Sequence, residues 1–141
     1  MVSNEGKDAI FIPQDSRTDF KQIIAKRSDL AKFNHGRIVK PASGDVIYQA
    51  GQVLGQISAA GPTQYRWAPY NPAATDGSQV AKAILAEPTD ADSSDNGTEI
   101  LMLTGGCAFY QDRMIGLDAA AITALGGRSY VESGVNILEL G

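Results

Sequence analysis

The residue types that most often carry chemistry are scarce in this chain of 141 residues. It contains one histidine, His35, and one cysteine, Cys107, so any nucleophilic relay would have to use these two. His35 lies in a turn-like stretch and Cys107 in a strand-like stretch beside Ala108 and Phe109. A surface histidine and a small core cysteine are therefore the simpler interpretations. A zinc-type metal site needs several His or Cys ligands, more than the chain has.

The acidic residues also fail to form a recognisable site. Asp90, Asp92 and Asp95 superficially resemble the acids of a calcium loop, but the glycine that should follow the third acid directly stands at Gly97. No glutamate completes the loop at the required distance. Gly105-Gly106 lies outside any phosphate-binding glycine motif. We therefore expect a solvated acidic loop, and a protein that is not an enzyme and uses no cofactor.

The charges are unevenly distributed along the chain. Its formal net charge is −4, but residues 1–40 carry eight basic residues against five acids, and residues 41–141 carry four against eleven. This asymmetry is either scatter along a solvated segment or a basic arm suited to an acidic partner surface. Nucleic acid is a poor partner, because Asp15, Asp19 and Asp29 interrupt the basic residues and the remaining chain is acidic.

Neither a membrane nor an oxidising compartment is indicated. No apolar run approaches the roughly 18 residues that a membrane span requires, and the N-terminal residues lack the pattern of a secretory signal. The single cysteine excludes an internal disulfide and fits a reducing compartment. We expect synthesis in a cytoplasm.

The first 36 residues are predicted to form an arm. Ile10, Phe11 and Ile12 run into Pro13, which favours a short extended stretch. From residue 18 to 33 the apolar residues, including Phe20 and Ile23, have roughly helical spacing and predict a weak amphipathic helix. Such an arm could pack on another molecule.

Residues 37–141 are predicted to form one core domain of short strands. Residues 46–50 and 53–57 suggest a hairpin around Gly51, and Asp76-Gly77 predicts a turn before a strand at 80–87. Residues 88–98 read as an exposed loop, followed by strands at 99–104, 107–110 and 135–140 and a glycine turn or bulge between the first two. The clearest helix runs from Asp118, a natural N-cap, to Leu125, and Gly126 ends it. The expected fold class is mixed α/β and β-rich: a small single domain of short strands with one short helix and an extended N-terminal arm.

The loop between residues 61 and 75 combines three prolines with three aromatic residues, Tyr65, Trp67 and Tyr70. Proline favours an ordered loop or an edge strand over a central strand. Aromatic side chains bring large, rigid contact area, so this loop is a candidate interface. It could equally fold back onto its own core.

One stretch of the sequence resembles a known family. The run YNPAATDGSQVA at 70–81, followed by Ile84-Leu85, resembles the bacteriophage head decoration proteins of the phage lambda type. The stretches GQVLGQI at 51–57, GLDAAAI at 116–122 and ALG at 124–126 also resemble that family, so the similarity covers roughly residues 44–126. Ala83 replaces a glycine usual in the family, and Lys26–Asp29 stands where members often have an extended segment.

The resemblance implies a virion protein that stands as a homotrimer on an expanded icosahedral head and stabilises it against packaged DNA. Its partners would be the major capsid protein and its own copies, with no direct contact to nucleic acid or membrane. It would act on the outer capsid surface after assembly in the bacterial host cytoplasm. We expect capsid binding by Ile10, Phe11, Ile12, Phe20 and Ile23, and a subunit or capsid interface at Tyr65, Trp67 and Tyr70.

An alternative is a carrier or hinge module of the biotinyl or lipoyl kind, because residues 44–57 loosely resemble the hairpins of such domains. A carrier needs an exposed lysine at a tight turn, and Lys82 lies in a strand-like segment instead.

Overall fold

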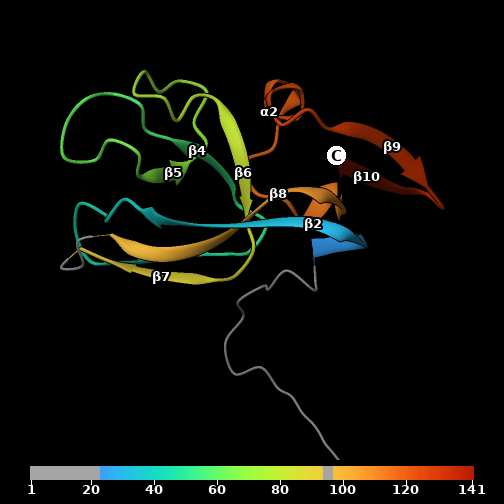
Figure 1. Cartoon of the computed structure of the whole chain (residues 1–141), viewed down its shortest axis with the longest axis horizontal. Coiled ribbons are helices and arrows are strands. Elements are labelled where there is room, and N and C mark those ends of the chain that lie inside the picture. Colours follow the sequence, from blue (N-terminus) through green and yellow to red (C-terminus); the bar gives the residue numbers. More distant parts are fainter. Residues whose placement is uncertain (1–22, 94–96) are drawn as a thin grey trace, which may run out of the picture.

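The computed structural model describes residues 23–93 and 97–141 and shows a barrel of β-strands with a hairpin and a short helix beside it (Figure 1). A sheet of seven strands has the order β2-β5-β4-β6-β8-β10-β9. An additional pairing of β2 with β8 closes the first five of these strands into a ring. The strands are β2 (Ile24–Ile38), β4 (Val53–Gln56), β5 (Trp67–Pro69), β6 (Ala81–Leu85), β8 (Thr98–Tyr110), β9 (Arg128–Glu132) and β10 (Val135–Leu140).

Three smaller elements complete the described fold. Strands β3 (Asp45–Tyr48) and β7 (Thr89–Asp92) pair with each other as a separate two-stranded ribbon. A 3-10 turn, η1 (Gln111–Arg113), follows β8 and precedes α2 (Ala119–Ala124). No helix in the described residues is long and apolar enough to cross a membrane.

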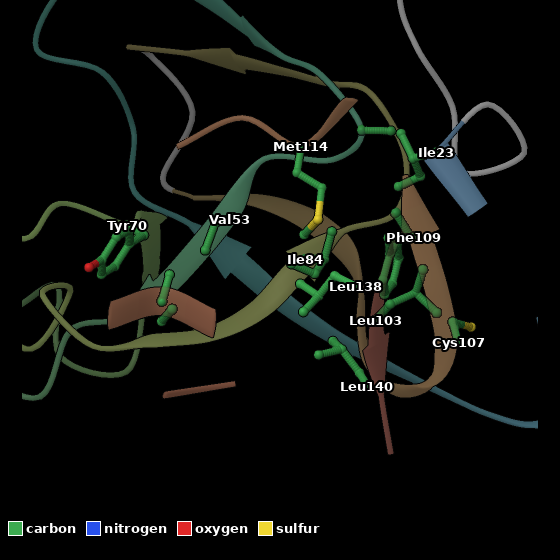
Figure 2. Packing of buried hydrophobic residues seen from close by; sticks show 14 residues of the cluster. Ile23, Val53, Tyr70, Ile84, Leu103, Cys107, Phe109, Met114, Leu138 and Leu140 are labelled. Atoms are coloured by element: carbon green, nitrogen blue, oxygen red, sulfur yellow. The ribbon is translucent and has the colours of Figure 1, made fainter. Parts of the chain in front are cut away.

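Strands β4, β6 and β8 bury consecutive residues, and because successive side chains of a strand point in opposite directions, both of their faces are covered. Val53, Ile84 and Leu103 join Phe109, Leu138 and Ala121 of α2 in one apolar cluster (Figure 2). Their neighbours form a second cluster with residues of β2, β7 and β8, composed of Ile38, Leu54, Ala83, Leu85, Ala91, Ile100 and Met102. The two apolar clusters thus lie on opposite faces of the same strands.

Several sequence predictions are confirmed. The helix is capped by Asp118, whose Oδ1 accepts a hydrogen bond from the Ala121 amide at 2.8 Å. Gly126 follows it at φ 70°, which is the left-handed conformation that commonly ends a helix. The predicted strands at 80–87 and 135–140 correspond to β6 and β10. The β-rich fold is confirmed, whereas the label mixed α/β fits only in that the described residues include one short α-helix.

The predicted helix at 18–33 is wrong from Ile24 onward; residues 18–22 lie outside the described residues. Ile24–Ile38 is instead a strand of 15 residues, antiparallel to β8. The pairing has register shifts between Arg27 and Lys32, which face Cys107 and Gly105. Extra residues in one strand break its alternation of apolar and polar side chains. The spacing therefore imitated a helix, and β2 crosses the expected boundary between residues 36 and 37.

Three further predictions are also corrected. Val46 and Tyr48 belong to β3, which pairs with β7, so no hairpin joins 46–50 to 53–57. The expected loop at 88–98 contains β7, in which Thr89 and Ala91 are buried and Asp90 and Asp92 are exposed. The glycine pair at 105–106 lies within the continuous strand β8 instead of separating two strands.

Candidate functional site

The structure separates the two residues that could have formed a nucleophilic pair. His35 is exposed on β2 opposite Leu101, and Cys107 is buried in β8 opposite Arg27. Six residues of strand between Leu101 and Cys107 correspond to about 20 Å. Within the described part of the chain, no group of three or more His, Cys, Asp and Glu residues is arranged to hold a metal ion.

A hollow of about 350 Å³ lies beside β7 and is lined in part by Glu87, Asp90 and Glu99. These acids line an open surface without converging as ligands. Lys82, the residue considered for a carrier, is exposed within β6 and not at a tight turn.

The three aromatic residues of the candidate interface have different positions. Trp67 is partly buried and packs against the second apolar cluster. Tyr70 is only 7% exposed and belongs to the first cluster, whereas Tyr65 is 68% exposed. The structure therefore does not bring them together as one aromatic surface. Of the three side chains, only that of Tyr65 is largely exposed.

Tyr65 is held outward by a strained but well-bonded backbone. Its φ is 70°, which is uncommon for a residue other than glycine and costs of the order of 1 kcal/mol. The amide of Tyr65 donates to Ile57 O at 2.7 Å, and its carbonyl accepts from Gln56 Nε2 at 3.1 Å. These bonds to the end of β4 fix the unusual conformation. Strain of this kind often marks functional positions.

The neighbouring loop, residues 71–80, is fixed by its own hydrogen bonds. Asp76 Oδ1 accepts from the Ser78 hydroxyl at 2.6 Å and from the Ser78 amide at 3.0 Å. These bonds, the hydroxyl bond first, lower the pKa of Asp76 below its ordinary value. Asn71 Oδ1 accepts from the Ala73 amide at 3.0 Å, and the Asn71 amide donates to Ser78 O at 3.1 Å.

The two loops form one surface. The amides of Ser58 and Ala59 both donate to Asp76 O, at 2.8 and 3.0 Å. We call the exposed residues of 58–65 and 71–80 the double-loop surface; they are Ser58, Ala59, Ala60, Gly61, Pro62, Thr63, Tyr65, Asn71, Pro72, Ala73, Thr75, Gln79 and Val80. None of them is charged. The sequence held this signal, since Arg66 and Asp76 are the only charged residues between 57 and 80.

Tyr70 connects this surface to the helix. Its hydroxyl donates to Asp118 Oδ1 at 3.0 Å and lies 3.2 Å from Oδ2. Burial first, and then the hydrogen bond to Asp118 and its charge, raise the pKa of Tyr70 above its ordinary value. Asp118 thus caps the N-terminus of α2 and also accepts the hydrogen bond of Tyr70 at the base of the loop.

A second exposed apolar surface was missed in the sequence. At the β9–β10 turn, Val131 is 65% exposed and Val135 is 37% exposed. We call residues 131–136 the hairpin tip. At the other end of the same hairpin, Arg128 forms an ion pair with Glu139 at 2.5 Å and lies over the Tyr130 ring at 4.8 Å.

Most of the residues expected to bind a capsid cannot be placed. Ile10, Phe11, Ile12 and Phe20 lie outside the described residues. Ile23, in contrast, is 0% exposed and packs in the same cluster as Phe109 (Figure 2). In this structure the Ile23 side chain is therefore inaccessible to a partner.

Comparison with known proteins gives one match. A family model described as bacteriophage lambda head decoration protein D matches residues 38–129, about two thirds of the chain. That range begins at the end of β2 and includes α2 and the double-loop surface. No curated protein and no solved structure matches the chain significantly.

Proposed function

The chain belongs to the family of the bacteriophage lambda head decoration protein D, and we propose that it binds as a homotrimer to the expanded icosahedral head. There it stabilises the shell against the pressure of packaged DNA. The partner is the major capsid protein, and the site of action is the outer surface of the virion. Assembly takes place in the host cytoplasm, without contact to nucleic acid or membrane, and no catalysis is involved.

The observation that carries this proposal is the family match over residues 38–129. The coarse role, a bacteriophage capsid decoration protein, follows from that membership. The described structure supports the finer proposal, because a closed barrel with two apolar cores provides a rigid body. A rigid body suits a protein that must hold neighbouring subunits in fixed positions, since little ordering entropy is lost on binding.

We assign attachment to residues 1–22, with Ile10, Phe11, Ile12 and Phe20 as the apolar contacts. An extended segment can add a strand to an exposed sheet edge of a capsid subunit. Ile23 has a different role in this proposal, because its buried side chain anchors the first described residue in the apolar core. Three segments from one trimer bind far more tightly than one, since the second and third bind at high effective concentration.

Deletion of residues 1–22 tests the proposal without removing β2, which a cut at residue 36 would destroy. The truncated protein should keep the thermal unfolding temperature of the full chain but no longer sediment with expanded shells. Shells mixed with it should rupture at the temperature of undecorated shells, because only bound protein stabilises them. Undiminished binding of the truncated protein would contradict the assignment.

Substitutions within residues 1–22 distinguish the effect of losing apolar contacts from the effect of adding negative charge. Phe11→Asp with Ile12→Asp should imitate the deletion, because the apolar contacts are lost. Asn4→Asp with Gln14→Asp adds the same charge to the same segment and should leave binding nearly unchanged. Equal loss in both double variants would indicate that net charge, and not apolar contact, controls attachment.

A further inference from the structure

We infer that the double-loop surface of one copy contacts the hairpin tip of the next copy around the trimer. This contact rests on the proposed function and specifies which surfaces join the subunits. The partner of the double-loop surface is therefore a second copy of this chain, and the capsid is left to residues 1–22.

The composition of the double-loop surface is that of an interface centre. None of its exposed residues is charged, whereas the four exposed residues between 81 and 92, Lys82, Glu87, Asp90 and Asp92, all are. Charged residues are depleted from the centres of protein interfaces, where they would lose their hydration. A surface that spans two adjacent loops and exposes no charged residue is therefore suited to being buried against a partner.

The surface is also fixed in shape before any partner arrives. Bonds from Ser58 and Ala59 to Asp76 join the two loops, and the bonded, strained backbone of Tyr65 points a large ring outward. A preorganised surface loses little conformational entropy on association. Tyrosine is also one of the residues most enriched among those that dominate binding energy.

The hairpin tip is the second surface that a ring-shaped trimer requires, distinct from the double-loop surface. A closed ring of three copies is built from head-to-tail contacts, so each copy must offer two distinct, complementary patches. The tip exposes Val131 and Val135 beside the small residues Ser133 and Gly134. In Figure 1 the loops lie at the left of the barrel and the tip at the right, so one copy can use both at once.

Some charged residues of the same loop and hairpin have partners within the same copy. The Asp76 carboxylate accepts both bonds from Ser78, and Arg128 is paired with Glu139. The double-loop surface would meet Val131 and Val135 of the hairpin tip, which also exposes the charged residue Glu132.

Light scattering on single variants tests the contact. Tyr65→Asp and Val131→Asp should each convert a trimer into a monomer at micromolar concentration, because a charge would be buried without a partner. Ile47→Asp is the matched control: Ile47 is 51% exposed but lies on β3, outside both surfaces, so this variant should stay trimeric. Aspartate tolerates the positive φ of residue 65 better than tyrosine, and circular dichroism verifies folding.

Mixing the two monomeric variants tests the head-to-tail arrangement. The Tyr65→Asp copy keeps an intact hairpin tip, and the Val131→Asp copy keeps an intact double-loop surface, so together they should form dimers that cannot close. A mixture that remains monomeric overturns the pairing of these surfaces. A trimeric Tyr65→Asp that no longer binds shells overturns the inference in favour of a capsid contact, while the proposed function stands.

A monomeric wild-type protein would overturn the inference, and shell binding would then judge the proposed function separately. If such a monomer still decorated and stabilised shells, only the trimer would be lost from the proposed function. If it also failed to bind shells, the decoration role itself would fail.

Discussion

Gly55→Ala should be among the most damaging single-methyl additions to this protein. Gly55 lies in β4 directly beneath residues 71–80, and a Cβ at this position would lie 2.6 Å from Ser78 O and 2.7 Å from Ser78 Cα. Ordinary contacts begin at 3.4 Å, so the loop must move by about 0.8 Å. The obstructing atoms are backbone, and they cannot rotate away as a side chain would.

The cost can be estimated from known overpacked cores, which lose about 1–3 kcal/mol. We expect about 3 kcal/mol because the loop is cross-linked by the bonds of Asp76 and Asn71 and must shift as a unit. For a domain of this size that loss lowers the melting temperature by about 10 °C. Hydrogen exchange should also accelerate at the Asn71 amide, whose acceptor is Ser78 O.

Gly44→Ala is the matched control. Gly44 has φ +69° but no atom within 4 Å of a built Cβ, so only conformational strain of about 1 kcal/mol is expected. Exchange at Asn71 should not change in this variant. The reasoning is refuted if Gly55→Ala melts within about 3 °C of the parent and leaves Asn71 protected.

Three further predictions follow from the site. In a double-mutant cycle of Tyr70→Phe with Asp118→Ala, measured by urea unfolding, the two losses should not add, because both remove the same hydrogen bond; additive losses would show that the bond contributes nothing. The pKa of Asp76 is lowered in the folded state, so the stabilisation that its carboxylate provides should be complete above about pH 4 and decrease as acid protonates the carboxylate. In a melting-temperature profile from pH 7 to pH 2, Asp76→Ala should lack this acid-dependent decrease. A profile identical to that of the parent would contradict the assignment. Cys107→Ser should cost about 1 kcal/mol of stability, because the buried thiol becomes a more polar hydroxyl, yet shell binding should persist; its abolition in a folded variant would reveal a functional thiol.

Local signals predicted the local elements of the fold. Asp118 and Gly126 define the two ends of α2 through contacts within a few residues. The Asp76-Gly77 turn likewise depends on neighbouring atoms, those of Ser78 above all. Such elements are predictable because the atoms that stabilise them are close in the sequence.

Long-range pairing was not predictable in the same way. β3 pairs with β7 across more than forty residues, and β2 passes through a bulge that hides its alternation. For residues 89–92 the alternation of buried and exposed positions was present, but two aspartates in four residues suggested a solvated loop. Tertiary pairing overrides weak local preference in segments of this kind.

The sequence did not indicate which of the three aromatic side chains of the candidate interface is exposed. Tyr65, Trp67 and Tyr70 lie within six residues, and only the barrel decides which ring is buried. The scarcity of charge between residues 57 and 80, where only Arg66 and Asp76 are charged, was the better indicator of the proposed interaction surface, because it does not depend on side-chain direction. The hairpin tip had no comparable signal, since exposed valines are common at strand ends.

The closing strand of the barrel has a consequence for how the chain acquires its structure. Ile24 pairs with Phe109 and Ile38 with Thr98, so β2 must find partners that are made 60 to 85 residues later. Contacts this distant in the sequence slow folding, because a long loop must close before they form. During synthesis β2 therefore emerges well before β8 and presents an unpaired strand edge. In a host making many copies at once, the β8 of another copy is a competing partner, and exchange of β2 between copies is the characteristic misassembly to expect.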